Sequence, residues 1–255
     1  MAPYITSTLL HNENTTVEIC LESVCEFRAD NEKSVEILHD MFDDRFHLRE
    51  ADFSRYPANH IRFLETPSVI SDYTYVGDID ILILEEIASI HLRNMQRTNL
   101  PYSNIVRPGK ERMSGLHFTK TADRYPLCIL SDDKLNLSDE EILYWQVAAQ
   151  GGSLPSSDDT FRPLHGYHLS LQRQPRPTGI SWGFRNNLPQ IEYFNSYLRL
   201  RDRVEWRSAL SAFDPRYLML LAILDVALGF MHPSEDLALL PKYTARRLFE
   251  AMKPL

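Results

Sequence analysis

Residues 73–84 read YTYVGDIDILIL, a mostly apolar run that contains Gly77, Asp78 and Asp80. Its aromatic and branched aliphatic residues predict a buried strand, where carboxylates are tolerated only if a cation or hydrogen-bond donors compensate their charge. One residue separates the aspartates, so an extended backbone directs both side chains to the same side, where they can approach one ion. The run therefore predicts a strand with a cation site. A pair of solvated acids at a strand end is the plainer alternative.

The composition is that of an ordinary globular protein. Of its residues, 44% are hydrophobic and 24% are charged. A length of 255 residues is enough for one large α/β domain, or for one domain with a modest helical appendage. The formal net charge of -8 argues against a nucleic-acid partner. Three cysteines have no metal-ligand or redox spacing, no segment resembles a signal peptide, and no apolar run reaches the roughly 18 residues that span a bilayer. We therefore expect a cytoplasmic protein.

Hydrophobic periodicity and capping residues predict the elements around this run. No Gly-rich phosphate loop occurs in the first half of the chain, which argues against a P-loop or a classical dinucleotide site. We expect strands at 4–10, 17–24, 45–53 and 73–84 and another ending near 118, and helices at 31–42, 58–70, 85–97, 138–149, 188–213, 217–231 and 242–253.

A basic, turn-rich segment follows the acidic run and could bind a diphosphate. It carries three cations within six residues, at 107–112, and a Ser-Gly pair at 114–115 that would let a substrate approach the main chain. Arginine's planar fork suits phosphate oxygens. A solvated loop is the alternative for these cations, and an ordinary surface ion pair is the alternative for the arginine at 62. The candidate contacts to a phosphate-bearing substrate are Arg62, Asp78, Arg107, Lys110, Arg112, Ser114 and Gly115.

An acidic helix start follows further along the chain. Ser138 is a good N-cap, and Asp139, Glu140 and Glu141 fill the first turn, where carboxylates interact favourably with the helix dipole. Capping explains these acids. The functional alternative is that one of them projects into the site as a catalytic base.

Two histidines lie on a loop that contains proline and glycine. His165 and His168 flank Gly166 and Tyr167. A histidine is usually structural, but neutral imidazole is also a good ligand for manganese-like ions. It supplies the residue type that the aspartate pair lacks.

Together these motifs resemble a GT-A glycosyltransferase of the kind related to the bacterial lipopolysaccharide galactosyltransferases and glycogenin. The likeness covers roughly residues 55–170 and is strongest at YVGDIDILI, SDEEILYWQ and RPLHGYH. It implies an α/β fold with a GT-A-like (Rossmann-like) mixed sheet flanked by helices. The catalytic domain would span 1–185, and a helical extension over 186–255 would pack on it.

The chain departs from this family in two places. The first 55 residues show only a faint nucleotide-binding strand and loop, which puts the nucleotide base in doubt. The lysine that often follows the late histidine is absent, although Arg173 and Arg176 could substitute for it.

The resemblance implies a metal-dependent enzyme. Asp78, Asp80 and one of His165 or His168 would hold Mn²⁺ or Mg²⁺ on the diphosphate of a nucleotide sugar, UDP-linked in this family. His168 is slightly favoured because it borders a strand-like segment.

The implied reaction moves a hexose, of galactose or glucose type, to a glycan or lipid-linked acceptor, as in surface polysaccharide synthesis. Basic faces on the last helices could associate peripherally with the inner face of a membrane. Two alternatives stay open. One is a metal-dependent nucleotidyltransferase that uses the same aspartates, although its usual upstream Gly-Ser is missing. The other is a non-catalytic carbohydrate-binding or scaffold protein.

Overall fold

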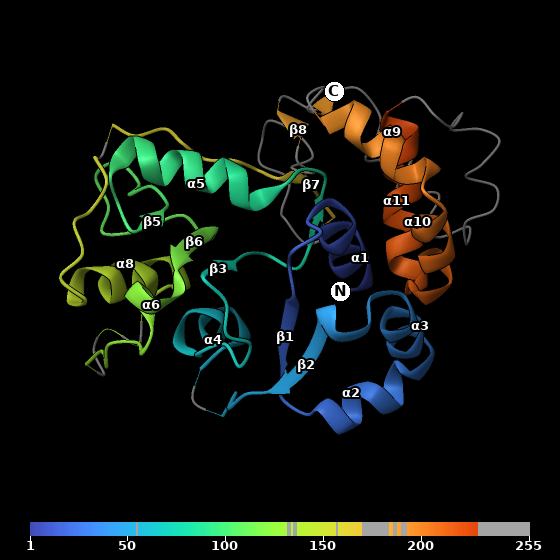
Figure 1. Cartoon of the computed structure of the whole chain (residues 1–255), viewed down its shortest axis with the longest axis horizontal. Helices are drawn as coiled ribbons and strands as arrows, with labels where there is room; N and C mark the ends of the chain where they lie inside the picture. The colour runs from blue at the N-terminus through green and yellow to red at the C-terminus, as the bar shows by residue number, and fades with distance from the viewer. Residues whose placement is uncertain are drawn as a thin grey trace.

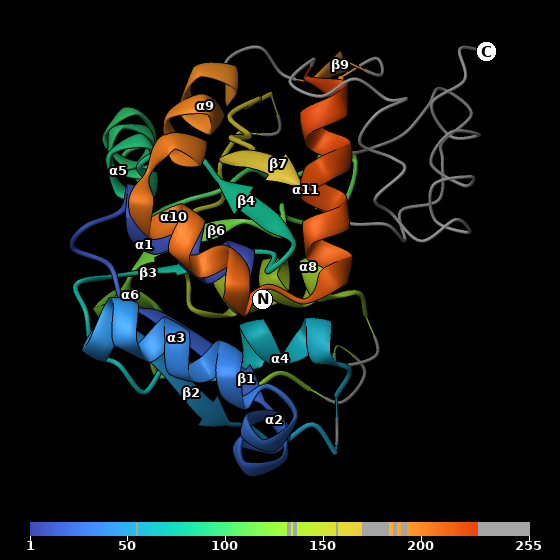
Figure 2. The same cartoon turned by 90° about the vertical axis from the view of Figure 1, so that its right-hand side faces the viewer.

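The protein is a mixed α/β fold in which short strands lie between groups of helices (Figures 1 and 2). The computed structural model describes residues 1–54, 56–131, 134, 137–156, 158–169, 184–185, 188–189 and 193–228. The expected helix at 242–253 and the expected substitutes Arg173 and Arg176 lie outside the described residues.

Helices make up most of the regular structure that is described, and none of these helices is long and apolar enough to cross a membrane. The helices are α1 (Ala2–His11), α2 (Val24–Asp30), α3 (Glu32–Phe42), α4 (Ala58–Leu64), α5 (Ile87–Thr98), α6 (Thr121–Arg124), α8 (Asp139–Ala149), α9 (Phe194–Asp202), α10 (Val204–Ala209) and α11 (Pro215–Ala227), with 3-10 turns η1 (Asp43–Arg45) and η3 (Leu210–Ala212). The strands are β1 (Val17–Leu21), β2 (Phe46–Glu50), β3 (Tyr73–Val76), β4 (Ile81–Ile83), β5 (Tyr102–Ser103), β6 (His117–Lys120), β7 (Gly166–His168), β8 (Phe184–Arg185) and β9 (Leu188–Pro189).

The described strands form several small sheets instead of one large sheet. β1 and β2 pair in parallel, and α2 and α3 connect them. β3, β6 and β5 form an antiparallel sheet in that order, β4 pairs with β7, and β8 pairs with β9. The expectation of an α/β protein is therefore confirmed, and a GT-A fold stays a prediction.

The single strand expected over residues 73–84 is wrong. β3 ends at Val76, β4 begins at Ile81, and the two strands belong to different sheets. Gly77 follows directly after β3 and lets the ring of Tyr75 pack against the backbone, because a Cβ at this position would lie 2.5 Å from that ring. The aspartates therefore lie in the connection between two strands, and a turn instead of the pleat of one strand orients them.

Two other expectations are corrected. Residues 4–10 are helical, in α1, although they were expected to form a strand. Pro3 suits the first turn of a helix, and residues 2–10 are all buried, so no apolar stripe marks this helix in the sequence. The helix expected over 188–213 is divided, because β9 occupies its start and an extended residue, Arg203, separates α9 from α10.

The other expected elements are present with different limits. Strands form within 17–24 and 45–53, β6 ends at Lys120 near the expected 118, and helices form within 31–42, 58–70 and 138–149. The helix expected at 85–97 ends one residue later, at Thr98, and the helix expected at 217–231 begins two residues earlier, at Pro215. Helix α4 ends before Pro67, and Ser138 is the N-cap of α8, both as expected.

Two hydrophobic clusters flank the turn between β3 and β4. The larger one joins α1, α3, β1, β4 and β7 to the C-terminal helices, through residues such as Ile5, Leu82 and Tyr197. Figure 2 shows α9, α10 and α11 beside α1 and the β4–β7 pair. The smaller cluster joins α4, β5 and α8 and includes Phe63 and Ile142. The C-terminal helices thus share a core with the N-terminal elements, and the boundary expected at residue 185 stays a prediction.

Candidate metal centre

The turn between β3 and β4 brings three candidate ligands together. Ligand atoms of Asp78, Asp80 and His168 all lie within 4.8 Å of one another. Oxygen ligands lie about 2.0–2.6 Å from Mg²⁺ or Ca²⁺, so two ligands of one ion are at most about 5 Å apart. Carboxylate oxygens with an imidazole nitrogen also form a donor set suited to Mn²⁺-like ions. These three residues could therefore hold a divalent cation.

The β4–β7 ladder places His168 beside the aspartates. His168 pairs with Ile81, the residue after Asp80, and the backbone N–H of Leu169 donates to the carbonyl oxygen of Asp80 at 2.6 Å. The imidazole is buried, with Nδ1 3.5 Å from Asp80 Oδ1, and this nitrogen has no hydrogen bond in the described part of the chain. A buried polar atom without a partner is costly. A cation bound at Nδ1 would satisfy it.

Asp78 has a cationic partner in Arg62, on α4. Arg62 donates through Nη1 to Asp78 Oδ1, through Nη2 to Asp139 Oδ2 at 2.5 Å, and through Nε to the carbonyl of Asn59 at 3.2 Å. Burial lowers the pKa of Arg62, but the carboxylates of Asp78 and Asp139 outweigh burial and raise this pKa above its ordinary value. Gly115 leaves room for the guanidinium, because a Cβ there would lie 2.9 Å from Nη2.

The basic segment pairs with the acidic start of α8. Arg107 Nη2 and Arg112 Nε both donate to the carboxylate of Glu140, and the backbone N–H of Gly115 donates to Glu140 Oε1 at 3.2 Å. Arg107, Arg112 and Gly115 thus meet at one carboxylate, close to Arg62. Both arginines are already engaged by this acid.

The remaining predicted residues lie around this group. The carboxylate of Glu141 accepts hydrogen bonds from the backbone N–H and the hydroxyl of Ser138, which lower the pKa of Glu141. Lys110 is exposed in a turn, and Ser114 is buried, where its backbone bonds to Asn104. A catalytic role for any of the three acids of α8 stays a prediction.

His165 lies at the opposite end of the β4–β7 ladder, away from the aspartate pair. Its Nδ1 is 2.8 Å from Glu85 Oε1, and its Nε2 is 2.9 Å from His91 Nε2. Both ring nitrogens are therefore used. Of the two predicted histidines, His168 is the one that joins Asp78 and Asp80 in the described structure.

Glu85 and His91 belong to a buried hydrogen-bond chain that the motifs did not predict. His91 Nδ1 lies 2.8 Å from the hydroxyl of Ser103, which also accepts from Asn94 at 2.9 Å. Burial, and then the neighbouring His165, lower the pKa of His91 to about 3, so the ring is neutral. With the Glu85 side-chain oxygen as the acceptor at one end, the donors run in one direction: Ser103 to His91, His91 to His165, and His165 to Glu85.

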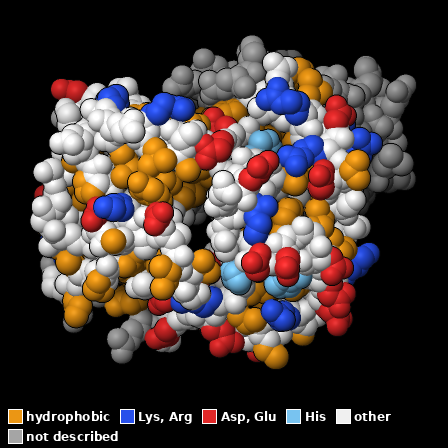
Figure 3. Space-filling view, in the orientation of Figure 1, with side chains coloured by type: hydrophobic (Ala, Val, Ile, Leu, Met, Phe, Trp, Pro, Cys, Tyr) orange, Lys and Arg blue, Asp and Glu red, His pale blue; other side chains and the backbone are white. Residues whose placement is uncertain are grey.

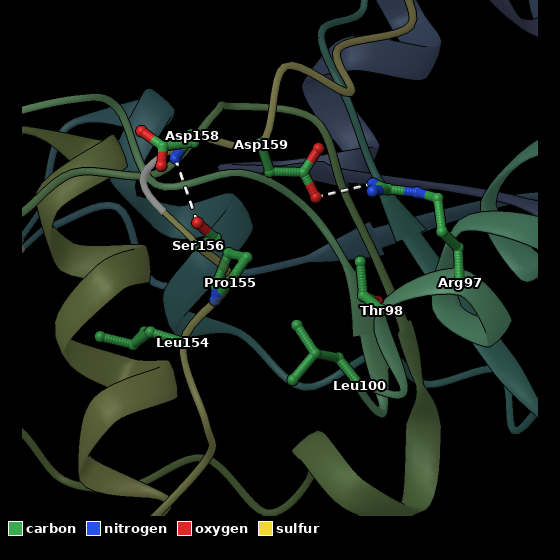
Figure 4. Close-up of a pocket in the computed structure, with 8 residues that line it drawn as sticks. All are labelled: Arg97, Thr98, Leu100, Leu154, Pro155, Ser156, Asp158 and Asp159. Carbon is green, nitrogen blue, oxygen red and sulfur yellow. Dashed lines mark hydrogen bonds and ion pairs between the residues drawn. The ribbon is translucent and has the colours of Figure 1, made fainter.

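This hydrogen-bond chain reaches the protein surface at Arg97, the end remote from Glu85. Arg97 donates through Nε to Asn94 Oδ1 at 3.1 Å. Through Nη2 it also donates to Asp159 Oδ2 at 2.6 Å (Figure 4). A sequence signal for its interior existed in α5, where Ile87, His91 and Asn94 are the buried positions. Their spacing of four and three residues is that of a core-facing helical stripe, so the polar members were predictable as buried groups that need partners.

Two surface hollows lie elsewhere. One, of about 380 Å³, surrounds the Arg97–Asp159 pair and is also lined by Leu100, Leu154 and Pro155 (Figure 4). The other, of about 470 Å³, lies between α5 and the ends of β3 and β6. Figure 3 shows hydrophobic side chains gathered on the left half of the view, where Figure 1 places α5 and α8. Neither hollow is lined by Asp78, Asp80 or His168.

Comparisons with models of protein families, with curated proteins and with solved structures gave no match. The function has to be argued from the chemistry of the described residues.

Proposed function

We propose that the chain is a metal-dependent glycosyltransferase that moves a hexose from a nucleotide diphosphate sugar to a glycan or lipid-linked acceptor. The observation that carries this proposal is the cluster of Asp78, Asp80 and His168, in which the buried His168 Nδ1 has no hydrogen bond among the described residues. Mn²⁺ or Mg²⁺ held there would act as a Lewis acid that neutralises charge building on the leaving diphosphate. A GT-A fold and a UDP-linked donor belong to the proposal and rest on the motif resemblance.

Arg62 would bind the same diphosphate. A guanidinium has five N–H donors, and three of those in Arg62 have partners, in Asn59, Asp78 and Asp139. Nη1 and Nη2 each carry one more donor, and their planar arrangement suits phosphate oxygens. The ion pairs hold the guanidinium in place, so little side-chain entropy would be lost on binding.

The acids of α8 differ in how available they are as a base for an inverting transfer. Asp139 is linked to the metal cluster through Arg62, which makes it the first candidate. Glu140 is held by two arginines, and Glu141 bonds to the N-cap of α8. We therefore propose Asp139 as the first candidate for this base, because Arg62 links it to the metal cluster.

A thermal-shift screen with UDP, GDP, CDP and ATP, each with and without Mn²⁺, tests the proposal. We expect a nucleoside diphosphate to raise the melting temperature only when Mn²⁺ is present. The Asp80→Ala variant should lose this response. Asp123→Ala removes a carboxylate from an exposed position and should keep it.

The outcomes separate the alternatives. Stabilisation by the triphosphate alone would favour a nucleotidyltransferase, and no metal-dependent response to any nucleotide would favour a scaffold and overturn the proposal. With the responding nucleotide known, slow hydrolysis of its hexose conjugates, detected as free sugar, would identify the donor.

A further inference from the structure

The β4–β7 ladder is short, although it sets the position of His168. Its three pairs are Ile81 with His168, Leu82 with Tyr167, and Ile83 with Gly166. A slip of one residue turns every side chain of a strand to the opposite face. It would place Tyr167 or Leu169 beside Asp80 instead of the imidazole. So short a ladder needs other contacts to exclude the slipped register.

The end of the ladder remote from the metal cluster supplies them. The backbone N–H of Leu84 donates to the carbonyl of His165 at 2.8 Å, and the His165 imidazole donates back to Glu85, the next residue, at 2.8 Å. His165 has a φ of 59°, which is uncommon for a residue with a side chain. Gly166 follows at a φ of 149°, and a Cβ there would lie 1.9 Å from the carbonyl oxygen of Leu82.

Helix α5 and strand β3 hold the other side of the His165 ring. His91 donates to its Nε2 at 2.9 Å, and the ring of Tyr75 lies edge-on at 5.5 Å. The other ring nitrogen of His91 is bonded to Ser103, on the side remote from His165. The His165 side chain is completely buried and bonded at both nitrogens. These contacts fix the position of its backbone, and therefore the residue at which β7 begins.

We infer that Glu85, His165 and His91 are positioning residues: they fix the register of β7 on β4 and thereby hold His168 against Asp78 and Asp80. None of the three is a ligand. The inference rests on the metal site of the proposed function. Residues that orient metal ligands typically contribute 10–100-fold to metal affinity, so loss of the Glu85–His165 bond should weaken Mn²⁺ binding by about tenfold or more.

The test uses the full chain with Mn²⁺ alone as the probe. Titration by isothermal calorimetry measures affinity, and pulsed electron paramagnetic resonance detects the nitrogen of a directly bound imidazole. We expect Glu85→Ala to weaken binding and to remove the nitrogen signal, because the aspartates would remain while His168 moves away. Glu85→Gln keeps an acceptor for His165 and should restore both readouts.

A matched control removes a hydrogen bond of the same network on the side of His91 that is remote from His165. Ser103→Ala removes the hydroxyl that bonds His91 Nδ1. It should lower stability but retain the nitrogen signal and an affinity within about twofold of the parent. Should Glu85→Ala fail to fold, His91→Leu, which removes the bond at the other nitrogen of His165, carries the same expectation.

The possible results are distinguishable. Absence of Mn²⁺ binding by the unaltered protein would overturn the metal site and the proposed function together. Binding by the unaltered protein with an unchanged nitrogen signal in Glu85→Ala would overturn the positioning role alone. An equal loss of affinity in Ser103→Ala would attribute the effect to general destabilisation and would also overturn it.

Discussion

Each end of the β4–β7 ladder carries a histidine beside a carboxylate, but the ring nitrogens of the two histidines differ in their hydrogen bonds. At one end, Asp80 and His168 lie side by side with the imidazole Nδ1 unbonded among the described residues. At the other end, Glu85 and His165 are joined by a hydrogen bond, and His91 occupies the second nitrogen of the ring. Both histidines are buried. Burial of a histidine is therefore a poor guide to its function, and the state of its ring nitrogens is a better one.

The difference has a physical basis. At the end with Glu85, His165 and His91, which we call the closed end, both ring nitrogens of His165 are bonded to described residues, so this network adds stability and leaves no nitrogen of His165 for a metal. At the end with Asp80 and His168, which we call the open end, the ligand atoms of Asp78, Asp80 and His168 lie close together, and His168 Nδ1 has no hydrogen bond among the described residues. Within one short ladder, we expect the first group to rigidify the fold and the second group to bind a cation.

Acid should disrupt the closed end, and this is the largest effect that we expect. The folded protein keeps His91 neutral down to about pH 3, whereas the unfolded chain takes up a proton below its ordinary pKa of 6.5. The unfolded state thus binds more protons between these values, and the free energy of unfolding falls as the pH falls, by on the order of 4 kcal/mol. Urea unfolding measured across this range checks the slope. His91→Leu should make it shallower, and identical slopes would contradict the assignment.

A methyl group at Gly166 should break both ends at once. The positive φ and the 1.9 Å approach to Leu82 would force β7 away from β4, at a cost of about 3 kcal/mol or more. Gly109→Ala is the matched control, since Gly109 also has a positive φ, of 66°, but no atom within 4 Å of the added Cβ. It should cost about 1 kcal/mol. Equal costs in urea unfolding would mean that the close approach is unimportant.

Asp80→Ala should affect only the open end. We expect Mn²⁺ affinity to fall by more than about 100-fold, since a ligand contributes more than the residues that orient it, which corresponds to roughly 2.7 kcal/mol or more. Calorimetric titration measures the loss. The melting temperature without metal should stay close to that of the parent, and Asp123→Ala should bind normally. Retained affinity in Asp80→Ala would remove this aspartate from the site.

Arg97→Ala should have the smallest effect. Its ion pair with Asp159 closes the surface end of the buried chain, but the Arg97 side chain is 55% exposed. Exposed pairs contribute at most about 1 kcal/mol. We expect a shift of that size in urea unfolding and no change in Mn²⁺ affinity. A larger loss, or a weaker metal site, would show that the two ends are coupled through the whole chain.

Much of the open end could be predicted from the sequence. The aspartate spacing, the late histidine pair, and Arg62 were all singled out, and Asp78, Asp80 and His168 do meet. The backbone geometry differs from the expected single strand, because β3 ends before Gly77 and a turn brings the carboxylates together. The buried helix α1 was mistaken for a strand because a helix that is buried on every side has no amphipathic pattern.

Local chemistry along the chain thus determined which residue types were available for a cation site, since a carboxylate in an apolar run needs compensation wherever it folds. Only the tertiary structure decided which histidine keeps a ring nitrogen without a hydrogen bond among the described residues. His165 and His168 are three residues apart and chemically identical, and what distinguishes them is their partners. His165 meets Glu85 and His91 from elements 80 and 74 residues away, and His168 meets Asp80 across the ladder. Such pairings depend on strand register and helix packing, which no local spacing specifies.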